Sequence, residues 1–168
     1  LRLLDVTGNR IRSLPESVGR LNNLVVLSVQ RNRLESLPES VGGLQNLVGL
    51  IAANNQLESL PNSLGSLNYL DLLFVYNNQL QSLPVNMGGL KNLIHLRVFN
   101  NQLESLPASM GKLENLLEII AWNNSLTSLP ETVGNMKSLT HVDVRHNKLD
   151  SLPASASKWS KMEYLYLA

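Results

Sequence analysis

The sequence contains no cysteine, which excludes a disulfide scaffold, thiolate catalysis and a cysteine-ligated zinc site within these 168 residues. Aromatic residues make up only 5% of the chain and charged residues only 16%, where soluble domains average about a quarter charged residues. The net charge of +1 lacks the basic excess that non-specific nucleic-acid binding requires. No apolar run approaches the ~20 residues of a membrane span, and no signal-peptide pattern opens the sequence. We therefore expect a chain that binds no nucleic acid, does not insert into a membrane and works in the cytoplasm.

Leucine and asparagine, by contrast, are abundant, and both recur at a fixed interval of twenty-three positions. The consensus of one unit reads LxxLxVxxNxLxSLPxSVGxLxN, and every full unit has Asn at its ninth place and contains the Leu-Pro pair. The seven full units begin at Leu1, Leu24, Leu47, Leu70, Leu93, Leu116 and Leu139, and a partial eighth unit begins at Met162. A period of about 20–50 residues is the signature of a repeat architecture, in which each unit buries its apolar face against its neighbours.

We expect residues 1–168 to form one domain and to be a fragment of a longer protein. The open ends of a solenoid need capping units, and neither end of the sequence resembles one. The last full unit also departs from the consensus, with Ala156, Ser157 and Trp159 where Val, Gly and Leu are usual.

Each part of the unit has a structural explanation. The alternation in LxxLxV predicts a short strand with one buried face. The Asn that follows predicts a turn whose buried N–H and C=O groups are bonded by the side-chain amide, so that stacked units form an Asn ladder. The SVGxLxN stretch after Pro fits one or two turns of α or 3-10 helix. Ser36 with Glu39, and Ser128 with Glu131, resemble capping boxes at the start of these turns.

This unit resembles the leucine-rich repeat, and the resemblance covers the whole chain. It implies an α/β fold: a solenoid with a parallel β-sheet on its concave face and short helical or 3-10 turns on its convex face. The SLPxSVGxL phrase is similar to intracellular repeats of the Ras-suppressor-like and Scribble-like class. Residues 49–61 and 118–130 are instead similar to repeats of secreted bacterial effectors, which would act in the cytoplasm of a host cell. Both subclasses stay open.

In leucine-rich repeats the third, fifth and seventh places of the unit point out of the sheet toward a partner, and packing does not dictate them. Six of the chain's eight aromatic residues occupy these places: Phe74, Tyr76, Phe99, Trp122, Tyr164 and Tyr166. Three of these, Tyr76, Phe99 and Trp122, fall on consecutive strands, about 4.8 Å apart. The residues that we predict to bind a partner are Ile51, Phe74, Tyr76, Arg97, Phe99, Ile120, Trp122 and Arg145.

This concentration of rings has two interpretations. Cross-strand pairs could merely stabilise the sheet, by about 0.2–1 kcal/mol per pair. Contiguous exposed aromatic residues, however, are more often interaction sites. The sheet would offer on the order of 600 Å², which approaches the ~800 Å² that each partner buries in a standard protein interface. An open sheet lacks the concavity of a small-molecule site, so we predict a protein partner and no small-molecule substrate.

Polar residues flank the predicted aromatic patch on both sides. Toward the C-terminal units lie Arg97, Glu118, His141, Asp143, Arg145 and His146. Toward the N-terminal units lie Arg2, Arg10, Arg12, Arg31 and Arg33, near the strand ends and the loops that follow. These residues either orient an acidic segment of the partner or form ordinary solvated surface.

Little in the sequence supports a metal site or a catalytic group. His95, Glu118 and His141 share one place in consecutive units, but the two histidines lie two strands apart, about 9.6 Å, which is too far to share a metal ion. The sequence has no GxSxG, GxGxxG, GxxxxGK[ST] or HExxH motif. We expect no enzyme activity, no cofactor and no bound metal.

The sequence thus favours a recognition module, or a scaffold for signalling, that binds a partner protein through the sheet. The alternative is the substrate-recognition arm of a larger enzyme, such as an effector ubiquitin ligase or a leucine-rich-repeat kinase, with its catalytic domain outside these residues. A solenoid whose sheet binds nothing is the third interpretation.

Overall fold

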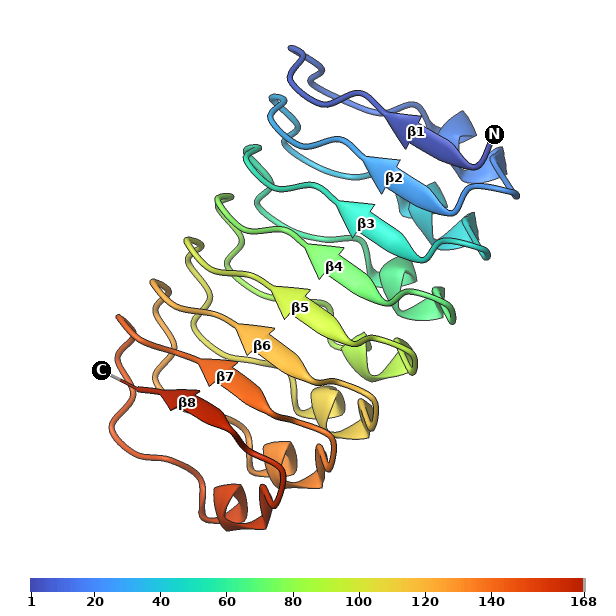
Figure 1. Ribbon diagram of the computed structural model, residues 1–168. Helices are drawn as coiled ribbons and strands as arrows, with labels where there is room; N and C mark the ends of the chain where they lie inside the picture. Colours follow the sequence, from blue (N-terminus) through green and yellow to red (C-terminus); the bar gives the residue numbers. More distant parts are fainter. Residues whose placement is uncertain (168) are drawn as a thin grey trace.

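The computed structural model describes residues 1–167, in which three-residue strands alternate with short 3-10 helices (Figure 1). Ala168, at the seventh place of the partial unit, lies outside the described residues. The strands are β1 (Leu3–Asp5), β2 (Val26–Ser28), β3 (Gly49–Ile51), β4 (Leu72–Phe74), β5 (His95–Arg97), β6 (Glu118–Ile120), β7 (His141–Asp143) and β8 (Tyr164–Tyr166). The helices are η1 (Glu16–Arg20), η2 (Glu39–Gly43), η3 (Asn62–Ser66), η4 (Met87–Gly89), η5 (Ala108–Lys112), η6 (Glu131–Asn135) and η7 (Ala154–Lys158).

The eight strands of the described residues form one parallel sheet in chain order. Each residue pairs with the residue at the same place of the next unit, from Leu3 opposite Val26 to His141 opposite Tyr164. The strands line one side of the molecule and the 3-10 helices line another, so that successive units stack as a solenoid (Figure 1). The predicted parallel-sheet solenoid is confirmed.

The consensus leucines and valines fill the space between the sheet and the 3-10 helices. In the third unit, for example, Leu47, Leu50 and Leu57 are completely buried. They belong to one apolar cluster that runs through the units without interruption, from Val18 to Val144. Burying a leucine side chain contributes about 1.5–3 kcal/mol, and here the neighbouring units provide the burial. One unit alone therefore has no core of its own.

The asparagine at the ninth place joins each turn to its neighbour, as predicted. The Asn55 Oδ1 accepts a hydrogen bond from the Leu34 N–H of the preceding unit at 2.9 Å. Its Nδ2 donates to the carbonyl of Val29 in that unit at 3.0 Å and to the carbonyl of Ala52 in its own at 3.2 Å. The same bonds recur at Asn78, Asn101 and Asn124. The Asn ladder therefore satisfies backbone groups that would otherwise be buried without a partner.

A second amide ladder runs beside the first, at the eighth place of the unit. The backbone there has a positive φ in every full unit, a conformation that Gly and Asn adopt more easily than other residues. Four consecutive units use asparagine, namely Asn54, Asn77, Asn100 and Asn123, with φ between 52° and 56°. Each of the last three donates its Nδ2 to the Oδ1 of the asparagine before it, at 2.6–2.8 Å.

The predicted capping boxes are wrong. Pro38 precedes η2 in an extended conformation, and no side chain caps this helix. The Glu39 carboxylate instead accepts a hydrogen bond from the Ser63 N–H of the next unit at 3.1 Å. Glu131 does the same with the N–H groups of Ala154 and Ser155, both at 3.2 Å. The glutamates therefore accept hydrogen bonds from unpaired N–H groups at the start of the next helix. The stacking of the units brings these N–H groups closer to each carboxylate than the N–H groups of its own helix.

The bond between Glu39 and the next helix predicts a pH-dependent contribution to stability. The hydrogen bond from the Ser63 backbone lowers the pKa of Glu39 below its ordinary value. A lowered pKa in the folded state stabilises the protein above the unfolded-state pKa, and this stabilisation is lost as the pH falls through the folded-state pKa. Glu39→Gln should therefore destabilise the protein at pH 7, and the difference from wild type should shrink below about pH 4. Urea unfolding of the wild type and the variant between pH 7 and pH 3 measures the free energy of unfolding of each, and so the difference between them at each pH.

Glu104→Gln is the matched control, because Glu104 is exposed and its carboxylate has no hydrogen bond within residues 1–167. This control should change stability little at any pH. A stability difference for Glu39→Gln that does not vary with pH would contradict the role assigned to the carboxylate.

Candidate partner-binding face

Outward side chains form three parallel rows: the third and fifth places of the unit lie in the strands, and the seventh place lies two residues beyond the end of each strand. We call this surface the sheet face. The strand register sets the rows, because Ile51 lies opposite Phe74 on the next strand, and Phe74 opposite Arg97. Side chains that are one full unit apart in sequence are therefore immediate neighbours on the surface.

Three rings stack along the seventh-place row. The ring centroids of Tyr76 and Phe99 are 4.4 Å apart with an angle of 9° between the planes, and those of Phe99 and Trp122 are 4.6 Å apart at 10°. The side chains are half-buried. We call these residues the aromatic stack. Because the two faces of Phe99 are covered by its neighbours, only the edge of the Phe99 ring remains open to a partner.

The fifth-place row places a fixed arginine beside this stack. The Arg97 guanidinium lies 4.8 Å from the centroid of the Phe74 ring, and its Nε donates to Glu118 Oε1 at 2.8 Å. The Arg97 side chain keeps 41% of its surface exposed. A cation held by both a ring face and a carboxylate loses less conformational entropy when a partner binds it.

Arg145 occupies the next position of the seventh-place row, but it does not extend the stack. Its guanidinium donates to the two carboxylate oxygens of Asp143 at 3.0 and 2.6 Å and lies 4.8 Å from the centroid of the Tyr166 ring. The hydrogen bonds to Asp143 raise the pKa of Arg145 above its ordinary value. Arg145 is thus fixed toward the fifth-place row, and the aromatic stack ends at Trp122.

A family model described as "Leucine rich repeat" matches residues 1–57, and a solved receptor structure matches the whole chain with a TM-score of 0.89. The fold is a leucine-rich-repeat solenoid. That receptor is the plant peptide hormone receptor RGFR1 in complex with RGF2, and its sequence is 29% identical. The match covers 100% of this chain and 28% of the receptor chain.

Two further leucine-rich-repeat structures are similar. A leucine-rich-repeat protein of Leptospira interrogans is 28% identical with a TM-score of 0.74, over 99% of this chain and 48% of that chain. The ectodomain of the plant membrane receptor kinase GASSHO1/SCHENGEN3 from Arabidopsis thaliana, in complex with CASPARIAN STRIP INTEGRITY FACTOR 2, is 30% identical with a TM-score of 0.83, over 94% of this chain and 19% of that chain. The chain thus spans about half the bacterial protein and less than a third of either receptor. A search of curated proteins found no match.

The repeats bring most of the predicted contact residues into one patch. The three rings of the stack lie beside the fifth-place residues of the central repeats, and Arg145 is exposed at one end of the row. The half-buried members of this patch are Ile51, Phe74, Tyr76, Arg97, Phe99, Ile120 and Trp122. We call these seven residues the central patch.

The expectation that packing does not constrain the outward places is wrong for four residues. Gly49 is buried, Ala53 is completely buried, and Ser28 and Asp143 are each only 5% exposed. Ala53 has a short side chain next to Tyr76 of the following unit. The Arg145 side chain covers Asp143. A side chain can therefore point out of the sheet and still be inaccessible, because larger neighbours in the same unit or in the adjacent unit cover it.

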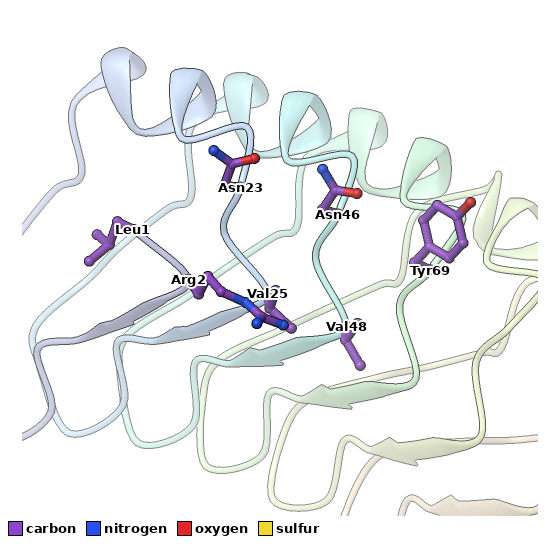
Figure 2. Close-up of a pocket in the computed structure, with 7 residues that line it drawn as sticks. All are labelled: Leu1, Arg2, Asn23, Val25, Asn46, Val48 and Tyr69. Atoms are coloured by element: carbon purple, nitrogen blue, oxygen red, sulfur yellow. The ribbon is translucent and has the colours of Figure 1, made fainter.

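One surface feature escaped the sequence-based prediction: a shallow groove of about 590 Å³ beside the first strands. Its lining includes Val25, Val48 and Tyr69, and Figure 2 shows Tyr69 in a row with Asn23 and Asn46. Tyr69 is 60% exposed. Four of the seven full repeats have Asn at this twenty-third place, and the Asn46 amide donates to the preceding repeat at 2.6 Å. The signal that could have identified the groove was a tyrosine at a place where four other repeats have asparagine.

The histidines of the third-place row lie beside other side chains of the sheet face. His95 Nδ1 lies 3.6 Å from Glu118 Oε1, whereas the His141 ring is tilted by 30° against the Tyr164 ring, with centroids 4.5 Å apart. Within residues 1–167, no three His, Cys, Asp or Glu side chains are grouped so that they could hold a metal ion. No helix in this range has the length and apolar character needed to cross a bilayer.

Proposed function

We propose that this leucine-rich-repeat chain is a protein-recognition module that binds a protein or peptide partner across the central patch. The observation that carries the proposal is the aromatic stack, with three aligned rings at the surface of a chain that is only 5% aromatic. Aromatic residues dominate the binding energy of protein interfaces because they bury a large apolar area with few rotatable bonds.

The fixed arginine beside the stack also supports binding. Arg97 has guanidinium N–H groups beyond the Nε that bonds Glu118, so it can still donate to a partner carbonyl or carboxylate. Phe74 and Glu118 hold it in place before the partner arrives. An apolar centre with an oriented polar contact at its edge is the usual composition of a protein interface.

Two similar solved structures lend weight to a protein or peptide ligand. RGFR1 was solved with RGF2, and the GASSHO1/SCHENGEN3 ectodomain with CASPARIAN STRIP INTEGRITY FACTOR 2. Those partners belong to those receptors, and we extend only the class of ligand to this chain. The likeness to a receptor-kinase ectodomain at 30% identity also supports the second candidate, in which these repeats are the recognition arm of a larger enzyme.

The competing explanation is that the stack only stabilises the sheet. Stacked ring pairs contribute about 0.5–1.5 kcal/mol beyond their burial, so some stabilisation is certain. Stability alone, however, does not account for an arginine and a glutamate ordered beside the rings at the surface. The cytoplasmic location and the Ras-suppressor-like or effector-like subclass also remain our proposals from the sequence.

Replacing Phe99 and Trp122 together by alanine should strongly weaken partner binding. Partners are recovered from a cell extract with the immobilised chain and identified, and the affinity of the purified partner is then measured by isothermal titration calorimetry. Removing two interface anchors costs about 2 kcal/mol or more each, so we expect the affinity to fall by roughly a thousandfold.

The matched control is Tyr69→Ala with Val85→Ala, which removes two exposed apolar side chains away from the sheet face. Circular dichroism and thermal melting of both double variants show that each is folded. Equal affinity of the partner for wild type and for the Phe99/Trp122 variant would reject the proposed function and leave the stack with a structural role only.

A further inference from the structure

The charge of the chain is distributed unevenly along the solenoid. The segment from Leu1 to Arg33 contains six arginines and two acidic residues, whereas the segment from Leu34 to Ala168 contains eight basic and eleven acidic residues. The net charge of +1 therefore conceals a basic N-terminal part and a mildly acidic remainder. Four of the six arginines lie close together, in the loops that follow β1 and β2: Arg10, Arg12, Arg31 and Arg33. We call these four residues the arginine cluster.

The backbone brings the arginine cluster to one edge of the sheet. Arg10 and Arg33 share the tenth place of consecutive repeats, and the Arg33 N–H donates to the Ile11 carbonyl at 2.9 Å. The loops that carry the cluster lie beyond the arrowheads of β1 and β2 (Figure 1). Neighbouring repeats are separated by about 4.8 Å, so the tenth-place arginines are adjacent on the surface.

All four arginines are exposed, because the residues between them point inward. Ile11 packs against the core and Asn32 belongs to the buried Asn ladder, so the alternate residues on either side face the solvent. None of the four forms an ion pair within residues 1–167. The nearest acidic residue by repeat position is Glu35, which shares the twelfth place with Arg12. Within the described residues, most of the positive charge of the cluster is therefore not neutralised by acidic side chains.

Arg31 also occupies an unfavourable backbone position. Its φ of 55° is that of the eighth place, where the following four repeats have asparagine. The amide ladder of those repeats starts at Asn54, so the second repeat has an arginine where an asparagine would extend the ladder. Arg31 thus occupies the backbone position of a ladder residue without bonding the ladder, as His146 also does, and its side chain is left available to a partner.

We infer that the arginine cluster binds an acidic segment of the partner that occupies the central patch. The inference rests on the proposed function, since it assigns a second part of the same interface. Four like charges in adjacent repeats repel each other until an anionic group neutralises them, and arginine binds carboxylates through two parallel hydrogen bonds. The near-neutral chain as a whole favours an acidic protein segment over a nucleic acid.

The spacing of the two surfaces defines the partner further. Arg31 directly follows the seventh-place row, and it lies two repeats before Tyr76, the first ring of the stack. Two strand spacings are about 10 Å, a distance that about three residues of extended chain cover. The partner should therefore carry an acidic stretch about three residues away from an apolar stretch.

A fluorescein-labelled peptide of ten glutamates is the probe for the cluster. Fluorescence anisotropy at about 50 mM NaCl should show binding to the wild-type chain, weaker at about 200 mM because salt screens exposed charges. The variant with Arg10→Gln, Arg12→Gln, Arg31→Asn and Arg33→Gln should bind the peptide at least tenfold more weakly. Its thermal melting temperature should not fall, because asparagine suits the eighth place.

The control variant removes four positive charges elsewhere, by Lys91→Gln, Lys112→Gln, Lys137→Gln and Lys148→Gln, all exposed in the structure. This variant should keep at least half of the wild-type affinity. An equal loss of affinity in both variants would show an effect of net charge alone and overturn the inference. Tighter binding of a ten-residue thymidine oligonucleotide, or of vesicles made from equal parts of phosphatidylcholine and phosphatidylserine, in an arginine-dependent way would overturn it in favour of a different partner class.

The two proposals can fail separately. The Phe99/Trp122 double variant should bind the glutamate peptide as wild type does, since neither ring belongs to the arginine cluster. Unchanged peptide binding by the arginine variant would reject the inference that the cluster binds an acidic segment, and it would not bear on the proposed role of the central patch. Unchanged partner affinity of the ring variant would instead reject the proposed function, whatever the peptide result.

Discussion

Replacing Asn124 by leucine is expected to lower the free energy of unfolding by about 3–5 kcal/mol, because it leaves several buried backbone groups without a partner. Asn124 is 9% exposed. Its Oδ1 accepts from the Leu103 N–H at 3.0 Å, and its Nδ2 donates to the carbonyls of Val98 at 3.1 Å and Ala121 at 3.0 Å. Each unsatisfied group costs about 1–3 kcal/mol, and two of the three lie in the neighbouring repeat. The variant should therefore weaken both the turn and the stacking of repeats.

Urea unfolding followed by circular dichroism measures this loss, and Asn115→Leu provides the matched control. Asn115 is exposed and makes a single side-chain hydrogen bond, to the Lys91 carbonyl at 2.9 Å. Water can satisfy that carbonyl after the substitution, so the expected change is within about 1 kcal/mol. A similar loss in both variants would show that burial of the amide is not what makes the ninth place important.

The second large effect is expected at Gly111, where alanine should destabilise the protein by about 2–3 kcal/mol through overpacking. Gly111 is buried in η5, against the next repeat. A Cβ added there would lie 2.6 Å from the Thr132 Cβ and 2.7 Å from the Thr132 carbonyl oxygen. The backbone carbonyl cannot rotate aside as a flexible side chain can. The two repeats would have to move apart, which loses contacts along the whole junction.

Gly49→Ala separates this steric effect from the general consequences of replacing a glycine. Gly49 lies in β3, and a Cβ there would meet only the Val26 side chain, at 3.7 Å, an ordinary contact. Since glycine inside a strand costs about 0.5–1 kcal/mol relative to alanine, this variant should be slightly stabilised. In chemical denaturation, the midpoints of the two variants should shift in opposite directions from that of the wild type. Destabilisation of both by equal amounts would refute the steric explanation.

The fold followed from the sequence because its determinants recur in every repeat. The alternation around Leu50, the turn at Asn55 and the Leu-Pro pair at Leu60 each predict a local conformation, and the constant length of the unit predicts how the units stack. The stacking of Tyr76 on Phe99 followed in the same way, since residues at one place of a parallel solenoid must be neighbours.

The features that escaped prediction depend on contacts between repeats that no local rule describes. The capping-box pattern assigned Glu39 to its own helix, whereas the stacked geometry brings the next helix within reach. Whether Ala53 is accessible depends on the size of the residues one strand away, and the path of Arg145 depends on a carboxylate and a ring in the adjacent row.

The second amide ladder has a consequence for how the molecule opens. Its donors all point toward the N-terminus, from Asn123 through Asn100 and Asn77 to Asn54, so each amide polarises the next and the four repeats gain cooperativity. Repeat proteins open locally, from the units with the fewest stabilising neighbours. The repeats that the ladder joins, which carry the aromatic stack, should therefore stay closed longer than the repeats outside it. Tyr76, Phe99 and Trp122 each directly precede a member of this ladder, so the ladder keeps the backbone beneath the three rings rigid.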